Sequence, residues 1–468
     1  MTSQATGLSR REFLAAGAHG FLRQEPRPNV IFLFVDDLGF GDLGVTGNRD
    51  VPTTNIDRMA AEGVLFRQFY TASPICSPSR AGVLTGQFPS RHGIHSYLSD
   101  RKSNAAAKMP DWLDPEAPSV ARAFQRAGYR TGHVGKWHLG GGRDVGDAPL
   151  PQAYGFDESW TSFEGLGDRL LVENDNLSRQ SAALGRGQIT WAPKHRTTEL
   201  YLDRAIDFMR RCGESPFYLH LWPMDVHDAH LPRPDLLDKY KRFAVNPYQQ
   251  RFYAVLEEFD RQVGRLLQFL DNSRLSERTL LVMTGDNGPT AWPRYYKEGF
   301  APPGSTAGFR GRKWSLYEGG IRQPLIARWP RRTPAGVVNA ATVMSAVDLL
   351  PTFCSLAGIS PPTAALDGED MSRALLGRKQ TRTRPLFWHY GFRGALQPGA
   401  EEDRSPSLAV RDGDWKLLMQ PDGTGVELYN LRSSPDERVN VAASRQREAR
   451  RLAESLTRWK DSLPKGLW

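Results

Sequence analysis

The chain has 468 residues, of which 40% are hydrophobic and 24% are charged, a globular composition that excludes a disordered or fibrous protein. Its 61 Lys and Arg against 52 Asp and Glu give a net charge of +9. No dense basic run accompanies this small excess, so we expect no nucleic-acid partner, and an anionic small substrate fits the charge.

The first 28 residues are predicted to form a leader. They contain S-R-R-E-F-L at residues 9–14, which resembles a twin-arginine export signal. We therefore expect a periplasmic or secreted protein. The simpler alternative is a disordered basic leader on a cytoplasmic protein. No stretch approaches the ~20 apolar residues of a membrane span, so none is expected.

Short apolar runs and amphipathic helices alternate from residue 29 onward. The run at 30–35 (V-I-F-L-F-V) is typical of a strand buried on both faces. Asn246 and Pro247 supply an N-cap and a first helical residue for a long helix with an apolar stripe from Phe252 to Leu270. The other predicted elements are helices at 119–127 and 199–211 and strands at 129–134, 217–221 and 279–284. This alternation predicts an α/β domain over residues 29–377, with a mostly parallel sheet covered by helices.

The last quarter of the chain has a different pattern. A basic, turn-rich linker at 378–384 is followed by short alternating runs separated by Asp-Gly turns. The runs lie at 386–389, 408–411, 415–419 and 426–431, and a polar helix follows at about 442–463. We expect residues 378–468 to form a small α+β subdomain, in which an antiparallel sheet packs with one helix.

Polar residues directly follow four of the predicted strands. They are Asp36-Asp37, Lys136-Trp137-His138, Asp225-Val226-His227 and Asp286-Asn287. Ligands bind at the carboxyl ends of strands in open α/β sheets, so these segments are predicted to meet in one crevice. The oxygen donors of the two aspartate-containing pairs suit Ca²⁺, with Mg²⁺ as the alternative. An aspartate pair after a strand can also form only a turn or a helix cap, but two such pairs at equivalent positions favour a metal site.

Cys76 lies in a polar, turn-forming segment, C-S-P-S-R, which leads into A-G-V-L-T-G. A lone cysteine is usually a small buried apolar residue, and Cys212 and Cys354 fit that description. The segment from Cys76 to Gly86, however, resembles the signature of the formylglycine-dependent (type I) sulfatases of the alkaline phosphatase superfamily. In that family this cysteine is oxidised to formylglycine after translation.

The resemblance extends from residue 29 to the C-terminal helix. Further matching segments are G-K-W-H-L-G (135–140), T-G-D-N-G (284–288), G-R-K-W-S-L-Y-E-G-G-I-R (311–322), R-D-G-D-W-K-L-L (411–418) and E-L-Y-N-L (427–431). It implies an alkaline phosphatase-like fold, in which a large mixed, mostly parallel sheet is flanked by helices, with a small C-terminal antiparallel sheet and helix. The family members that this chain resembles most are sugar sulfatases of the N-acetylgalactosamine-6-sulfatase and arylsulfatase type.

The resemblance also implies roles for individual residues. Cys76 becomes formylglycine, and the metal ligands are Asp36, Asp37, Cys76, Asp286 and Asn287. Arg80 binds the modified residue, Lys136 and Lys313 bind sulfate oxygens, His138 is the base, and His227 is the acid for the leaving alcohol. His230 is an alternative to His227, because the proline that usually lies two residues after this histidine is missing. Considered singly, each histidine could be structural and Lys313 could be a solvated charge.

The substrate is expected to be a sulfated saccharide, cleaved by exo action, or an aryl sulfate. Its contacts are predicted at His95, Asp100, Arg101, Trp388, His389 and Arg393. A formylglycine-generating enzyme is the implied maturation partner. Two alternatives stay open at this point: a phosphonate or phosphate ester hydrolase on the same fold, and an inactive protein that binds sulfated glycans.

Overall fold

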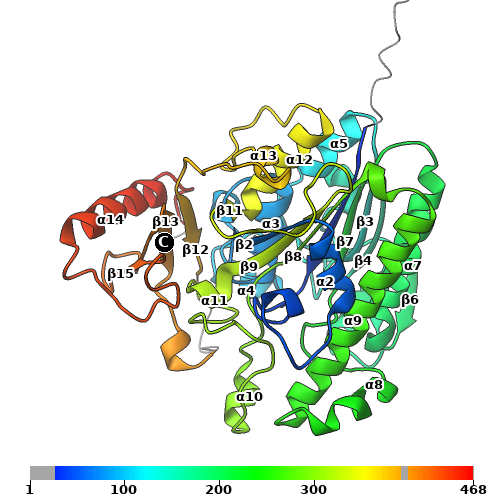
Figure 1. Cartoon of the computed structure of the whole chain (residues 1–468), viewed down its shortest axis with the longest axis horizontal. Coiled ribbons are helices and arrows are strands. Elements are labelled where there is room, and N and C mark those ends of the chain that lie inside the picture. The colour runs from blue at the N-terminus through cyan, green and yellow to red at the C-terminus, as the bar shows by residue number, and fades with distance from the viewer. Residues whose placement is uncertain (1–26, 392–398, 467–468) are drawn as a thin grey trace, which may run out of the picture.

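The computed structural model describes residues 27–391 and 399–466 (Figure 1). The predicted leader lies almost entirely outside the described residues, and so does Arg393. Within them, no helix combines the length and the apolar character needed to cross a membrane.

The larger sheet is mixed and mostly parallel. Its strands, from one edge to the other, are β10 (Val337–Asn339), β2 (Val64–Tyr70), β9 (Arg322–Arg328), β8 (Thr279–Gly285), β1 (Asn29–Val35), β7 (Phe217–Trp222), β3 (Arg130–Lys136), β4 (Glu158–Ser162), β5 (Arg169–Val172) and β6 (Ile189–Ala192), and β11 (Met344–Ser345) pairs with β2. Only β9 runs antiparallel to its neighbours β2 and β8. The strands β1, β2, β3, β7 and β8 therefore all end at the same edge of the sheet.

Both faces of this sheet are covered by helices. Successive apolar side chains of β1 point to opposite faces, so each face needs an apolar cover. Val30, Phe32 and Phe34 belong to the core of one face, while Ile31, Leu33 and Val35 belong to the core of the other. The first face carries α3 (Cys76–Thr85), α5 (Val120–Arg126) and α12 (Leu349–Ala357), and the second carries α2 (Thr54–Ala61), α7 (Thr197–Cys212) and α9 (Pro247–Asn272). The predicted alkaline phosphatase-like α/β architecture is confirmed.

Shorter helices lie in the connections between these elements. They are α4 (Arg101–Ala106), α6 (Asn176–Ala183), α8 (Pro234–Lys239), α10 (Pro293–Lys297), α11 (Glu318–Ile321) and α13 (Ser372–Leu375). The long helix α9 begins where its sequence predicts, because the side chain of Asn246 accepts hydrogen bonds from the backbone N–H groups of Tyr248 and Gln249.

The second sheet is antiparallel, with the order β12 (Leu386–His389), β13 (Leu408–Asp412), β14 (Trp415–Met419) and β15 (Glu427–Asn430). Helix α14 (Gln446–Asp461) packs on β13 and β14, and this part lies at one end of the molecule in Figure 1. Its apolar residues join the core of the first sheet in one continuous cluster. The domain boundary at residues 377 and 378 stays a prediction.

Candidate active site

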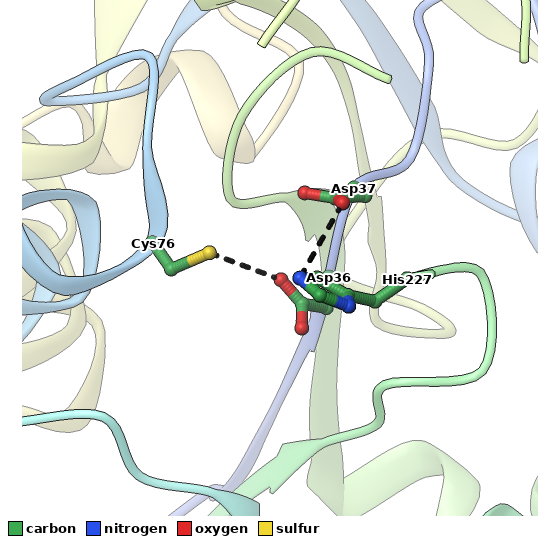
Figure 2. A group of neighbouring side chains, drawn as sticks. All are labelled: Asp36, Asp37, Cys76 and His227. Carbon is green, nitrogen blue, oxygen red and sulfur yellow. Dashed lines mark hydrogen bonds and ion pairs between the residues drawn. The ribbon is translucent and has the colours of Figure 1, made fainter. Parts of the chain in front are cut away.

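The strand ends of the large sheet bring distant residues together. Asp36 and Asp37 follow β1, Lys136 ends β3, and β2 leads into Cys76 at the start of α3. Figure 2 shows Cys76, Asp36, Asp37 and His227 gathered at one place, and one potential ligand atom from each of the four lies within 4.8 Å of the others. Residues that follow β1 and β7 therefore lie beside the start of α3, as the prediction of a shared site requires.

Buried ion pairs hold this cluster together. Lys136 Nζ lies 2.6 Å from Asp36 Oδ2, and Lys313 Nζ lies 2.6 Å from Asp37 Oδ1. Arg80 donates to Asp286 Oδ2 at 2.6 Å and lies 3.4 Å from Asp36. Burial alone would raise the pKa of Asp36, but the surrounding cations, Lys136 first, lower it well below its usual value.

The donor set fits a hard divalent cation. The amide of Asn287 donates to Asp37 Oδ1 at 2.7 Å, whereas its buried Oδ1 has no hydrogen-bond partner among the described residues. Burial and the negative charge of the neighbouring Asp36 raise the pKa of Asp286 to about 7. The carboxylates of the cluster therefore repel one another despite the nearby cations. An ion held by these oxygens would satisfy the amide oxygen and relieve the repulsion.

Cys76 is buried at the first turn of α3. Its Sγ lies 3.5 Å from Asp36 Oδ1 and 3.3 Å from Lys136 Nζ. Burial raises the pKa of this thiol to about 12, despite the nearby Lys136. The unmodified side chain is therefore a neutral thiol at pH 7, and only the thiolate is a strong nucleophile.

Two of the three candidate histidines lie at the centre. Nε2 of His227 lies 3.7 Å from Asp37 Oδ2, and burial followed by the charge of Lys313 lowers its pKa to about 4. His138 approaches Leu98 O at 3.2 Å, and burial followed by Lys136 puts its pKa well below the usual value. His230 is turned away, with its Nε2 2.9 Å from Val226 O and its ring against Phe252.

The five described residues predicted to bind substrate have their interactions elsewhere in the structure. His95 stacks on His389 with ring centroids 4.7 Å apart, Asp100 caps α4, and Arg101 pairs with Asp111 and Asp147. Trp388 is a core residue whose Nε1 donates to Thr71 O at 2.8 Å. Aromatic side chains suit sugars, which predicts Trp388 at the pocket mouth, but this tryptophan on β12 fills the contact between the two sheets.

A cavity of about 380 Å³ adjoins the cluster and reaches Lys136 and His227. Its walls include Arg143, Phe163 and Glu164, none of which is among the site residues predicted from the sequence. They follow no motif, and their position depends on how β3, β4 and β5 pair. None of the five described residues predicted to bind substrate lines this cavity.

Lys194 is a further buried residue beside this cavity. Its Nζ donates to the backbone carbonyls of His227 and Ala229, the latter at 2.7 Å. Burial lowers the pKa of Lys194 to about 8. The lysine thus joins the segment before α7 to the loop after β7, which carries His227.

Comparisons with known proteins agree with this site. The Sulfatase family model matches residues 28–359, and the model named N-sulphoglucosamine sulphohydrolase, C-terminal, matches residues 308–462. The chain is 35% identical over 403 residues to N-acetylgalactosamine-6-sulfatase of Canis lupus familiaris. The matched region covers 83% of this chain and 73% of that protein.

Solved structures share the fold over most of the chain. The crystal structure of Ps i-CgsB in complex with k-i-k-neocarrahexaose has a TM-score of 0.76 and 25% identity, and covers 94% of each chain. The phosphonate monoester hydrolase of Agrobacterium radiobacter has a TM-score of 0.64 at 21% identity, covering 93% of this chain and 95% of that one, so the fold alone does not separate the ester classes. The family match and the 35% identity do separate them: the chain belongs to the sulfatase family and is a sulfuric ester hydrolase.

Proposed function

We propose that the enzyme releases sulfate from a terminal sugar of a sulfated saccharide, with formylglycine at position 76 and a bound Ca²⁺ or Mg²⁺. The observation that carries this proposal is the position of Cys76, in contact with Asp36 and Lys136 beside a set of oxygen donors. The similarity to an N-acetylgalactosamine-6-sulfatase supports a saccharide as the substrate.

The chemistry explains why the cysteine must be modified. A hydrated formylglycine offers two hydroxyl groups on one carbon, so one can take the sulfuryl group and the other can later lose a proton to expel sulfate. The cation, when bound, lowers the pKa of a coordinated hydroxyl and withdraws charge from a sulfate oxygen. A buried thiol with a pKa of about 12 offers neither function.

The surrounding side chains supply charge and protons. Arg80, Lys136 and Lys313 are buried cations that we assign to the modified residue and the sulfate oxygens, because charge developing on these oxygens is stabilised most in a dry site. His138 is neutral and suits the role of base. His227 is also neutral at pH 7, and a bound sulfate would favour its protonated form, the form that donates to the leaving alcohol.

Mass spectrometry of the peptide that contains Cys76 tests the nucleophile. In protein co-expressed with a formylglycine-generating enzyme, we expect the mass of formylglycine at this position. Unmodified cysteine in all of the protein under these conditions would contradict the proposal.

A comparison of substrates tests the ester class and the ion. We expect kcat/KM for 4-nitrophenyl sulfate to exceed that for the phosphate monoester and for a phosphonate ester, and chelation to abolish turnover until Ca²⁺ or Mg²⁺ is returned. A larger kcat/KM for either phosphorus ester would assign the enzyme to the alternative class.

The location of the protein is also a proposal. We propose that residues 1–28 direct export to the periplasm or the medium, supported by the S-R-R-E-F-L segment. Replacement of Arg10 and Arg11 by lysine would then retain the protein in the cytoplasm, as measured by cell fractionation. An unchanged distribution would contradict export through this signal.

A further inference from the structure

The cavity beside the reaction centre bears on which sulfate ester is cleaved, and this inference rests on the proposed function. At about 380 Å³ it lies near the lower end of the range of about 300–1,000 Å³ for small-molecule sites. Because Lys136 and His227 belong both to the charged centre and to the lining of this cavity, a sulfate held at the centre would direct its alcohol portion into this space.

Phe163 lies in the wall of the cavity beside the charged centre. Its ring centroid lies 4.8 Å from Lys136 Nζ, and its ring packs edge-on against His138 at 4.9 Å and lies 6.3 Å from His227. It therefore touches the side chain proposed to bind sulfate and both proposed proton carriers, and presents an apolar surface of the kind that packs against a sugar ring.

Glu164 continues the same wall. Its side chain is 5% exposed, its Oε1 accepts from Arg143 Nε at 2.6 Å, and its Oε2 lies 3.8 Å from His138 Nε2. Phe163 and Glu164 have φ values of 40° and 58°, the left-handed region that non-glycine residues rarely adopt. Strained backbone of this kind concentrates at binding and catalytic sites.

The charges around the rest of the cavity are mainly negative. Four carboxylates line it, and the cations beyond Lys136 are Arg143, which pairs with Glu164, and Lys194, which binds backbone carbonyls. The carboxylates are Glu164, Glu173, Asp175 and Asp228. An alcohol that carried a second sulfate or a carboxylate would meet like charges here.

We propose that this cavity selects a neutral sugar as the leaving alcohol. Glu164 is the specificity-determining residue, and it accepts hydrogen bonds from the hydroxyl groups of the sugar. The acidic residues of the lining exclude a sugar that carries a second anionic group. The small volume favours a single terminal ring.

The first test isolates the hydroxyl groups. The matured enzyme is assayed on N-acetylgalactosamine 6-sulfate and on cyclohexylmethyl sulfate, a primary alkyl sulfate with a six-membered ring and no hydroxyls. We expect kcat/KM to be at least about tenfold higher for the sugar, and Glu164→Gln to reduce this ratio about tenfold, since hydrogen bonds to charged groups are the stronger ones. Glu454→Gln, an exposed carboxylate on α14, is the matched control. A ratio unchanged by Glu164→Gln would overturn the role of Glu164.

The second test isolates charge. We expect kcat/KM for N-acetylgalactosamine 4,6-disulfate to be at least about tenfold below that of the 6-sulfate, and Glu173→Lys, at the exposed rim, to narrow this gap several-fold, less so at high salt. Equal turnover of the two sugars by the wild type would overturn the selection of neutral sugars, and so would a gap that Glu173→Lys leaves unchanged. Matured enzyme that fails on 4-nitrophenyl sulfate as well would instead overturn the proposed sulfatase mechanism, and this inference with it.

Discussion

Cys76 occupies a position where a side chain can contact both an anion and a cation of the site. Asp36 lies on one side of its sulfur and Lys136 on the other, and both are buried. A polar group at this position is expensive to bury unless it is engaged. The same surroundings that keep the thiol neutral would hold a hydroxyl-bearing residue in two hydrogen bonds.

Replacement of Cys76 by alanine is expected to abolish turnover without loss of the fold. The change deletes one buried heavy atom, which costs about 1 kcal/mol of unfolding free energy, whereas the loss of a nucleophile lowers kcat by at least about a thousandfold. Steady-state assays and thermal unfolding measure the two effects. Cys354→Ala, in the core of α12, is the control, and Cys76→Ala with a rate near the wild type would contradict the mechanism.

The unmatured protein offers a pH test of the same site. The pKa of Cys76 is raised from 9.0 to about 12 by burial, so the thiolate fraction at pH 8 falls roughly a thousandfold. We expect iodoacetamide to label Cys76 in chelator-treated, folded protein far more slowly than in urea, with the rate rising about tenfold per pH unit. Peptide mass spectrometry measures the labelling. Equal rates in folded and unfolded protein would contradict this pKa.

At the scale of the elements, the site depends on loops at the ends of parallel strands. The loop after β7 carries His227, and Lys194, just before α7, donates to two of its carbonyls. These two hydrogen bonds fix the backbone of the loop at His227 and Ala229. Lys194 therefore acts as a positioning residue for the side chain of His227.

Lys194→Met is expected to lower kcat about tenfold or more for a sugar sulfate, whose alcohol is a poor leaving group. The variant leaves two carbonyls without their donor, and the misplaced His227 then protonates the alcohol less well. A sugar sulfate needs this proton, whereas 4-nitrophenol leaves readily without it, so the loss should be much larger for the sugar sulfate. Lys241→Met, at an exposed lysine, is the control. Equal losses on both substrates would show that Lys194 does not act through His227.

The predicted elements with a complete local pattern agree with the structure. The run at 30–35 lies within β1, and the stripe from Phe252 to Leu270 lies within α9. Local sequence patterns do not predict β2, whose apolar run is interrupted by Arg67 and Gln68, or the outer strands β4, β5 and β6, which are short. β2 pairs with β9 and β4 pairs with β3, and β5 and β6 then extend the sheet from β4. These strands therefore depend on partners outside their own sequences.

Across the whole molecule, the two sheets are joined by a buried ion cluster as well as by apolar packing. Lys416 on β14 lies 3.0 Å from Glu318 Oε1 and 2.9 Å from Glu437 Oε1, with all three side chains fully buried. Glu318 opens α11, five residues after Lys313. The small sheet therefore supports the segment that brings Lys313 to the centre.

Lys416→Met is expected to destabilise the protein by about 3–5 kcal/mol at pH 8, because the buried carboxylate of Glu437 loses its cation and Glu318 keeps only its ion pair with Arg322 among the described residues. Burial raises the pKa of Glu437 to about 7, above the value of the unfolded chain. The folded state thus binds more protons between about pH 4.5 and 7, and this carboxyl lowers stability as the pH rises through that window. At pH 5.5 this carboxyl is protonated in the folded state, so the loss of unfolding free energy caused by Lys416→Met should be smaller than at pH 8. Urea unfolding at both pH values measures it, with Lys379→Met at the surface as the control, and equal deficits at pH 5.5 and pH 8 would contradict the buried pair.

The sequence by itself predicted the segments that carry the candidate site residues, most of the central strands and helices in chain order, and the presence of two sheets. These features depend on residue types within one segment: an apolar run, a stripe of period 3.6, or a motif such as C-S-P-S-R. The structure alone decided that His227 and not His230 faces Asp37, that Trp388 fills the core, and that Phe163 and Glu164 form the cavity wall. Such contacts join residues as far apart as Asp37 and Lys313, and they follow from the order in which strands pair across the sheet, which no local pattern specifies.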